Sequence, residues 1–245
     1  MQVAKYNASG NDFVIFHTFE EKDYSELAKK LCHRQKGIGA DGLIVLIPNN
    51  KYDFKWLFYN SDGSHAAMCG NGTRACAHYA VSNGLANNSM KFLTDAGVIS
   101  SSVNDKIVET ELTDVKKLSD KFTEFEKEWF FYDTGVPHLV TVVKTLDEYS
   151  KELASKMRYK YNANVNFVFV DERGLHVRTY ERGVEDETGA CGTGMAACFY
   201  SLYKENKIGG SSKIYPTSKE ELNLRISKER LFFKGEVTKV FETNI

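Results

Sequence analysis

Residues 69–76 read CGNGTRAC, and residues 191–198 read CGTGMAAC. Both stretches fit the pattern C-G-x-G-x-x-A-C, and they lie 191 − 69 = 122 positions apart, about half of the 245-residue chain. A repeat at this distance indicates two halves of similar plan rather than a solenoid of short units. In both copies the glycines precede a stretch with a helical pattern, so we expect each copy to begin a helix.

The start of a helix favours negative charge. Its first backbone N–H groups have no partner inside the helix, and its dipole is positive at that end. Cys69 and Cys191 stand directly before the predicted helices, so the same N–H groups would stabilise a thiolate and lower the pKa of each thiol. A substrate carboxylate would bind there for the same reason. The trailing Cys76 and Cys198 lie about two turns inward, and we expect them to be small core residues.

The residues alone leave three functional interpretations of the repeat open, beside a plain two-helix core in which the cysteines are small hydrophobes. The first is a dinucleotide-binding loop, because both copies satisfy G-x-G-x-x-A, although acidic side chains rather than a buried strand precede each copy. The second is a metal site of cysteine with His65 or His78, although no C-x₂₋₄-C pair is present. The third places Cys69 and Cys191 on opposite sides of one carbon, where one thiolate removes a proton and the other thiol supplies one.

The composition restricts the class of protein. The 32 Lys and Arg residues nearly balance 33 Asp and Glu residues, so no net field attracts nucleic acid or a membrane surface. No apolar run approaches the ~18 residues that span a bilayer, and the N-terminus lacks the apolar core of a signal peptide. The five cysteines cannot all pair. We therefore expect a soluble, cytoplasmic protein with reduced thiols and with neither a nucleic-acid nor a membrane partner.

Short apolar or alternating stretches dominate the chain and predict strands. The predicted strands cover residues 13–16, 43–47, 54–59, 98–103, 107–112, 129–132, 139–143, 165–170, 175–180, 222–226, 231–233 and 237–241. Helical patterns cover residues 24–33, 73–82, 146–156 and 194–206. Because strands and helices do not alternate regularly, the predicted fold class is α+β. The polar stretch 114–121 is the best candidate for a boundary near the midpoint.

The sequence resembles the diaminopimelate epimerase family, the cofactor-independent two-cysteine amino-acid epimerases, along nearly its whole length. The motifs that carry the resemblance are, in chain order, residues 5–13 (KYNASGNDF), 37–43 (GIGADGL), 60–72 (NSDGSHAAMCGNG), 135–138 (GVPH), 164–167 (NVNF), 180–183 (YERG) and 187–194 (ETGACGTG). Each motif alone is modest, and the ordered set is very specific.

The resemblance implies a fold of two similar α+β domains, each with a mixed, barrel-like sheet around a central helix, and an active site in the cleft between them. It also implies that the last strand returns to the first domain. We therefore expect one domain from residues 1–115 and 235–245 and a second from residues 116–234.

The resemblance also implies an activity. The chain would be an isomerase that interconverts LL- and meso-diaminopimelate, in lysine and peptidoglycan precursor biosynthesis, with no metal and no cofactor such as pyridoxal phosphate. Cys69 and Cys191 would be the catalytic acid and base, and His138 and Glu181 would tune the thiol pKa values. The implied substrate-binding residues are Asn11, Asn60, Gly70, Asn71, Asn164, Glu181, Arg182, Gly192 and Thr193. The implied partner is a small amino-acid substrate, and a homodimer is one expectation for the assembly.

Several of these residues also have structural interpretations. Asn11 and Asn164 could be turn residues that bond their own backbone. His138 could cap a strand and contact solvent, and Glu181 with Arg182 could form a solvated ion pair.

Val136 departs from the family pattern, which commonly has Asn at this position. A buried hydrogen bond to a charged group contributes ~1.5–3 kcal/mol, so either a neighbour such as Thr134 or a water molecule supplies the contact, or the substrate differs. A racemase of another amino acid is therefore the alternative within the class. A dinucleotide-binding oxidoreductase and a non-catalytic binding protein are the alternatives from other classes.

Overall fold

The computed structural model describes residues 1–245, and the chain forms two compact units. Unit 1 comprises Met1–Glu111 with Lys234–Ile245, and unit 2 comprises Leu112–Phe233. These ranges differ by a few residues from the expected division. The division into two domains with the expected bounds stays a prediction.

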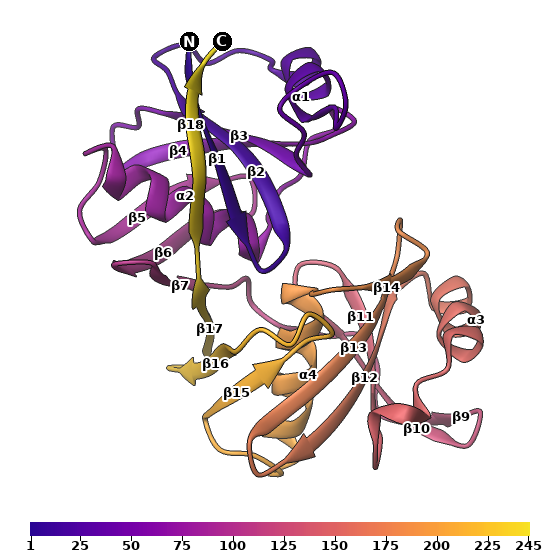
Figure 1. The fold of residues 1–245 in the computed structure, drawn as a ribbon. Coiled ribbons are helices and arrows are strands. Elements are labelled where there is room, and N and C mark those ends of the chain that lie inside the picture. The colour runs from indigo at the N-terminus through magenta and orange to yellow at the C-terminus, as the bar shows by residue number, and fades with distance from the viewer. The chain divides into compact units, whose positions relative to one another are not determined.

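Unit 1 is a mixed sheet with two helices (Figure 1). Its strands are β1 (Gln2–Ala8), β2 (Asn11–His17), β3 (Gly42–Ile47), β4 (Phe54–Asn60), β5 (Ser89–Thr94), β6 (Gly97–Asn104), β7 (Ile107–Glu111) and β18 (Thr238–Asn244), and its helices are α1 (Ser25–Cys32) and α2 (Gly70–Ser82). The strands pair in the order β18-β1-β2-β3-β4-β5-β6-β7. Only the pairs β2–β3 and β4–β5 are parallel.

Unit 2 has the same kind of sheet. Its strands are β8 (Lys116–Lys117), β9 (Phe122–Glu124), β10 (Lys127–Asp133), β11 (Pro137–Val142), β12 (Asn164–Asp171), β13 (Gly174–Glu181), β14 (Asp186–Thr188), β15 (Ser211–Tyr215) and β16 (Leu222–Ser227). Its helices are α3 (Lys151–Tyr161) and α4 (Gly192–Lys204), with a 3₁₀ turn η1 (Leu146–Glu148) before α3. β17 (Arg230–Glu236) runs from unit 2 into unit 1.

The two units share one plan. Successive pairings are antiparallel, parallel, antiparallel, parallel and antiparallel from β1 to β6, and again through β10, β11, β12, β13, β15 and β16. Helices α1 and α2 occupy the two parallel crossovers of unit 1, and α3 and α4 occupy those of unit 2. Figure 1 shows α2 and α4 each lying among the strands of its own unit, against which they pack. The predicted fold class, α+β with two similar halves, is confirmed.

Apolar side chains fix each helix to its sheet. In unit 1, the buried side chains of Trp56, Phe58 and Phe92 pack in one cluster with the alanines of α2. In unit 2, Trp129 and Phe167 pack with Met157 of α3. These clusters bury the sheet face under α2 and the sheet face under α3, and burial of apolar surface is the largest favourable contribution to folding.

The helix predicted over residues 146–156 is two elements in the structure. η1 ends at Glu148, and α3 begins at Lys151 because the Oγ of Ser150 accepts the N–H of Leu153. A serine at this position satisfies one of the free N–H groups of a new helix and so sets where it begins. The prediction also omitted short strands such as β15, in which Ile214 is the only buried residue.

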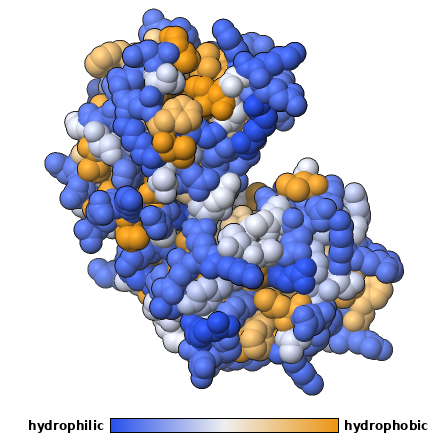
Figure 2. All heavy atoms as spheres, in the orientation of Figure 1, coloured by the Kyte–Doolittle hydropathy of each residue, from blue (hydrophilic) through white to orange (hydrophobic).

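None of the helices combines the length and the apolar composition needed to cross a bilayer. Figure 2 shows a surface dominated by hydrophilic residues with separate, smaller hydrophobic patches.

Gly194 is required by the close approach of α4 to its sheet. A Cβ at Gly194 would lie 2.3 Å from the Oδ1 of Asn166 and 3.2 Å from the Oγ1 of Thr179, whereas a Cβ at Gly72, the matching position of the first repeat, would meet nothing closer than 3.4 Å. We expect Gly194→Ala to lower the free energy of unfolding by about 1–3 kcal/mol through overpacking. Urea unfolding would measure this change, with Gly72→Ala as the matched control. Equal stabilities of the two variants would contradict it.

Candidate functional site

Cys69 and Cys191 are the residues that begin the two repeat helices. Both have an extended backbone directly before the helix, with φ −148° and ψ 115° at Cys69 and φ −120° and ψ 106° at Cys191. The Sγ of Cys69 accepts the N–H of Gly72 at 3.4 Å and so caps α2. Cys69 is half-buried and Cys191 is 8% exposed. The expected placement of both thiols at helix starts is confirmed.

The first turns of α2 and α4 supply the N–H groups expected from the repeat. The hydrogen bonds within the two helices begin with the N–H of Thr73 to Cys69 and the N–H of Met195 to Cys191. The earlier N–H groups therefore have no acceptor inside the helix. They belong to Gly70, Asn71 and Gly72 in α2, of which Gly72 donates to the Sγ of Cys69, and to Gly192, Thr193 and Gly194 in α4. A carboxylate is the ligand that such groups favour.

The trailing cysteines of the repeat are core residues, as expected. Cys76 and Cys198 are fully buried. Burial raises the pKa of both thiols well above the usual range, which leaves them unreactive at neutral pH. None of the five cysteines forms a disulfide in the structure.

His138 lies under the first turn of α4 and is linked to Cys191 through Thr193. It stands near the start of β11, directly beside Asn164 of β12. Its Nε2 lies 2.9 Å from the Oγ1 of Thr193, and that Oγ1 lies 3.5 Å from the Sγ of Cys191. The interpretation of His138 as a solvent-exposed strand cap is wrong, because the ring is 0% exposed.

The His138 ring is neutral. Burial lowers its pKa to about 3, and the positive charge of Arg182 acts in the same direction. A neutral imidazole can donate through one nitrogen and accept through the other, so it can organise the Thr193 hydroxyl without placing a second charge beside the thiol.

The predicted binding residues of unit 2 gather at the ends of β12 and β13. The Oδ1 of Asn164 accepts the backbone N–H of Arg182 at 2.7 Å, so Asn164 is not a turn residue bonding its own backbone. Glu181 accepts the hydroxyl of Thr188 at 2.8 Å. The guanidinium of Arg182 donates to the carbonyl oxygen of Asn162 at 3.0 Å.

In unit 1, Asn11 is held by the side chains on either side of it. Its Oδ1 accepts from the Nδ2 of Asn71 at 2.6 Å, and its own Nδ2 donates to Asp41 at 3.0 Å. Asn71 in turn accepts from the fully buried Arg74 at 2.7 Å. These bonds leave one N–H of the Asn11 amide for a ligand. They also show that Asn11 bonds to other side chains and is not a turn residue that bonds its own backbone.

Arg34 and charged residues of the first two sequence motifs form a network around Asp41, which accepts from Asn11. Arg34 contacts Asp12 at 2.5 Å and Asp41 at 2.6 Å, and Lys5 contacts Asp12 at 2.7 Å. Burial acts to raise the pKa of Asp12, but the hydrogen bonds from Arg34 and Lys5 hold it below the usual range.

Asn60, at the end of β4, donates to the hydroxyl of Ser64 at 3.0 Å.

Sequence reasoning missed several residues that organise the site. Asn166 and Thr179 contact each other under α4 in unit 2, and Asp41 and Arg74 hold the amides of unit 1. Asn166 could have been found from the NVNF motif, because the period of two in a strand places residues 164 and 166 on the same face.

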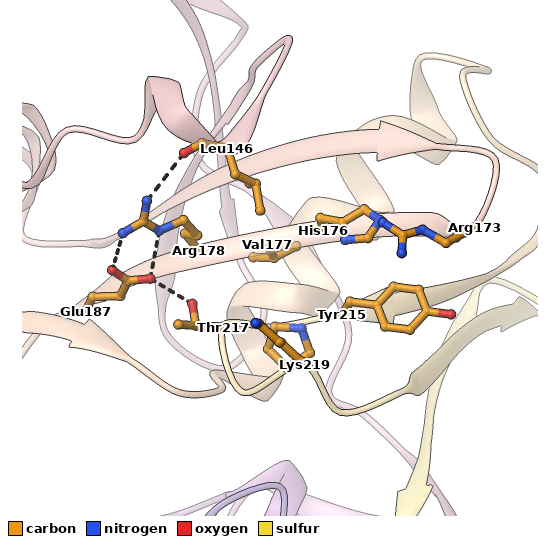
Figure 3. Close-up of a pocket in the computed structure, with 10 residues that line it drawn as sticks. Leu146, Arg173, His176, Val177, Arg178, Glu187, Tyr215, Thr217 and Lys219 are labelled. Carbon is orange, nitrogen blue, oxygen red and sulfur yellow. Dashed lines mark hydrogen bonds and ion pairs between the residues drawn. The ribbon is translucent and has the colours of Figure 1, made fainter.

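A separate cavity of about 630 Å³ lies in unit 2 (Figure 3). At one end of it, Arg178 binds Glu187 through two hydrogen bonds of 2.8 and 2.5 Å, and Glu187 also accepts from Thr217. The bonds from Arg178 lower the pKa of Glu187. Because Glu187 lies in β14, four residues before Cys191, this ion pair braces the segment that leads to the thiol. The structure holds no cluster of three or more His, Cys, Asp or Glu placed to bind a metal ion.

Comparison with known proteins identifies similar chains. Residues 3–118 and 130–240 match the family described as diaminopimelate epimerase. Among curated relatives, the diaminopimelate epimerase of a Nitratiruptor species is 59% identical and covers 99% of this chain and 98% of its own. The diaminopimelate epimerase of Helicobacter pylori is 39% identical, with coverage of 95% and 92%.

Solved structures show the same fold at low sequence identity. A phenazine biosynthesis protein of Bacillus anthracis aligns with a TM-score of 0.73 at 17% identity, covering 100% of this chain and 98% of its own. A hydroxyproline epimerase of Agrobacterium vitis aligns with a TM-score of 0.72 at 13% identity, covering 99% and 91%. At these identities the likeness concerns the fold alone.

The buried His138 ring should stay neutral well below the pH at which ordinary histidines become charged. We expect its ring ¹⁵N signals to remain constant from pH 8 to pH 5. The unfolded chain binds this proton below about pH 6.5, so the stability due to the neutral ring is present above that pH and declines towards pH 3. Titration of the His138 signals near pH 6.5 would contradict this prediction.

Proposed function

The chain belongs to the diaminopimelate epimerase family, and from this membership we propose that it interconverts LL- and meso-diaminopimelate through the side chains of Cys69 and Cys191. The match over most of the sequence makes the chain an epimerase, an isomerase that inverts one stereocentre. The observation that carries the two-thiol mechanism is the position of both cysteines at the start of a helix, in matching places of two repeated units.

The proposed reaction moves one proton away from an α-carbon and one proton onto it. A thiolate at one cysteine takes the α-proton, and its S–H bond forms as the C–H bond breaks. The electron pair left on the α-carbon delocalises into the substrate carboxylate and then takes the proton of the other cysteine from the opposite face. One thiol and one thiolate are present before and after, with the roles exchanged, so the reverse reaction uses the same groups.

The helix N-termini supply the electrostatic part of this mechanism. We propose that the N–H groups of Gly70 and Asn71 and those of Gly192 and Thr193 hold the reacting carboxylate and stabilise the charge that develops on it. The dipoles of α2 and α4 act in the same direction and also favour the thiolate form of Cys69 and Cys191. This support comes from fixed backbone groups, so it needs no rearrangement during the reaction.

The remaining predicted residues are proposed to bind the substrate's other polar groups. Each lies at the end of a strand or, in the case of Arg182, directly after one; the residues are Asn11, Asn60, Asn164, Glu181 and Arg182. His138 is proposed to act through Thr193 rather than on the substrate.

Val136 bears on which amino acid is the substrate, because its side chain cannot make the hydrogen bond that Asn makes at this position in the family. Its neighbour Thr134 is buried, and its hydroxyl donates to the carbonyl oxygen of Thr193 at 2.8 Å. That hydroxyl can still accept a hydrogen bond but has no hydrogen left to donate. A compensating donor for the substrate would therefore have to be another residue or a water molecule.

A role in lysine and peptidoglycan precursor biosynthesis, a cytoplasmic location and a homodimeric assembly are further parts of the proposal. The location is supported by the chemistry, because two catalytic thiols require a reducing compartment.

The activity and the substrate can be tested in one experiment. The reduced protein, pretreated with hydroxylamine to remove any carbonyl cofactor, is incubated with LL-diaminopimelate in deuterated water and followed by proton NMR. We expect the meso isomer to form with solvent deuterium at the inverted carbon. Loss of activity after hydroxylamine treatment would overturn the cofactor-independent mechanism. If another amino acid were deuterated at its α-carbon and diaminopimelate were not, that amino acid would be the substrate.

The repeat provides matched controls for the two thiols. We expect Cys69→Ala and Cys191→Ala each to lower the epimerisation rate at least a hundredfold, because each removes one partner of the proton transfer. Cys76→Ala and Cys198→Ala change the same residue type seven positions further on and should retain activity in the folded protein. Turnover at the wild-type rate by either variant of the leading cysteines would exclude the two-thiol mechanism.

A further inference from the structure

The polar side chains under α4 form a chain of hydrogen bonds whose directions follow from chemistry. The fully buried Asn166 is its starting point. Its Nδ2 donates to the carbonyl oxygen of Leu139 at 2.8 Å, and its Oδ1 accepts from the Oγ1 of Thr179 at 2.8 Å. Because a carbonyl oxygen cannot donate, the reversed amide would face Leu139 with an oxygen and lose this bond. The orientation of the Asn166 amide is therefore fixed.

This orientation determines where His138 carries its hydrogen. The Nδ2 of Asn166 lies 3.1 Å from the Nδ1 of His138, and its second hydrogen is available for that contact. Nδ1 must accept this hydrogen, so the neutral ring has its own hydrogen on Nε2. Nε2 then donates to the Oγ1 of Thr193 at 2.9 Å. The hydroxyl hydrogen of Thr193 remains available for the Sγ of Cys191 at 3.5 Å.

We propose that Asn166 is a positioning residue that holds His138 in the tautomer with hydrogen on Nε2, so that the Thr193 hydroxyl donates to the sulfur of Cys191. This inference rests on the proposed function of Cys191 as one of the two bases. A hydroxyl donor stabilises the thiolate more than the thiol, because a hydrogen bond to a charged acceptor is the stronger one. The chain of bonds therefore favours the form of Cys191 that removes a proton.

The matching positions of unit 1 lack this chain. Because Asn166 pairs with Thr179 across β12 and β13 as Ile44 pairs with Phe58 across β3 and β4, the two pairs occupy equivalent places. By the same alignment, Phe13 occupies the place of His138.

The layer under α2 is therefore apolar where the layer under α4 is polar. A Cβ at Gly72 would meet the side chains of Phe13 and Ile44, whereas a Cβ at Gly194 would meet those of Asn166 and Thr179. Each thiol lies at the N-terminus of a helix, but only Cys191 has polar side chains of the sheet beneath its helix. We expect Cys191, and not Cys69, to depend on residues at the sheet positions.

Two charged residues stand at the end of β13. The charge of Arg182 favours the neutral His138 ring, and Glu181 accepts the hydroxyl of Thr188. Cys198 in the same helix is fully buried as a thiol. The amide of Asn164, whose Oδ1 accepts the backbone N–H of Arg182, places its Nδ2 3.4 Å from the Nε2 of His138 and opposes a hydrogen on that nitrogen. The contact of the Asn166 Nδ2 with Nδ1 is shorter, at 3.1 Å, so Asn166 determines the tautomer.

The tautomer can be measured directly and without substrate. Histidine labelled with ¹⁵N gives ring spectra in which the protonated and unprotonated nitrogens are distinguished, and His138→Gln assigns the signals. We expect hydrogen on Nε2 in the wild-type protein and on Nδ1 in Asn166→Asp, because a carboxylate can only accept. Hydrogen on Nδ1 in the wild-type protein would overturn the proposal.

The effect on the thiol is measured as the pH dependence of alkylation by iodoacetamide. Cys191 is followed in a Cys69→Ala background, and Cys69 in a Cys191→Ala background, so that the charge of one thiol does not affect the other. We expect Thr193→Val to raise the alkylation midpoint of Cys191 by about one to two pH units, and Thr193→Ser, which keeps the hydroxyl, to restore it.

Asn166→Asp links the two measurements. It should raise the midpoint of Cys191 as Thr193→Val does, add nothing further in the Thr193→Val background, and leave Cys69 unchanged. An unchanged Cys191 midpoint in Thr193→Val, which keeps the side-chain shape, or equal shifts of both cysteines in Asn166→Asp, would overturn the proposal. Because neither measurement uses turnover, failure of the proposed function would appear separately, as full activity of Cys191→Ala.

Discussion

The backbone N–H groups at the starts of α2 and α4 are the constraint from which the rest of the structure follows. The first N–H groups of a helix have no acceptor within that helix. If they are to bind a ligand, the residues at the ends of the neighbouring strands must leave these N–H groups accessible. Both units achieve this by placing each helix in a parallel crossover between strands. A cysteine before the first turn then experiences a positive field from the backbone alone.

The second constraint is what lies beneath each helix. Under α2 the strands offer aromatic and aliphatic side chains, and the helix packs by apolar contact. Under α4 they offer amide, imidazole and hydroxyl groups that are buried and therefore need partners. Each of these groups finds a partner within one network, and this network leads to one thiol. The two units thus share the arrangement of strands and helices and differ in the layer buried under the repeat helix.

The sequence predicted the repeat, the helix starts and the two cysteines well, because short-range chemistry determines them. A Cys-Gly pair before a helical pattern identifies a helix start whatever packs around it. The sequence did not single out Asn166, whose importance depends on the carbonyl of Leu139, 27 positions away, and on a tautomer of His138. It also misplaced α3, because one serine hydroxyl decided where that helix begins. Partners brought together by pairing of distant strands are not visible in local patterns.

The return of the chain to unit 1 affects the order in which the protein can fold. β18 pairs with β1 along most of its length, and the backbone of Ile245 bonds to Met1. During synthesis, all of unit 2 is available before β18 exists, so unit 2 can complete its contacts while β1 is paired with β2 on one edge and unpaired on the other. An unpaired strand edge of this kind is a site for association with other chains. The amino-terminal half of the protein is therefore the last to close and the more dependent on protection from other nascent chains until it does.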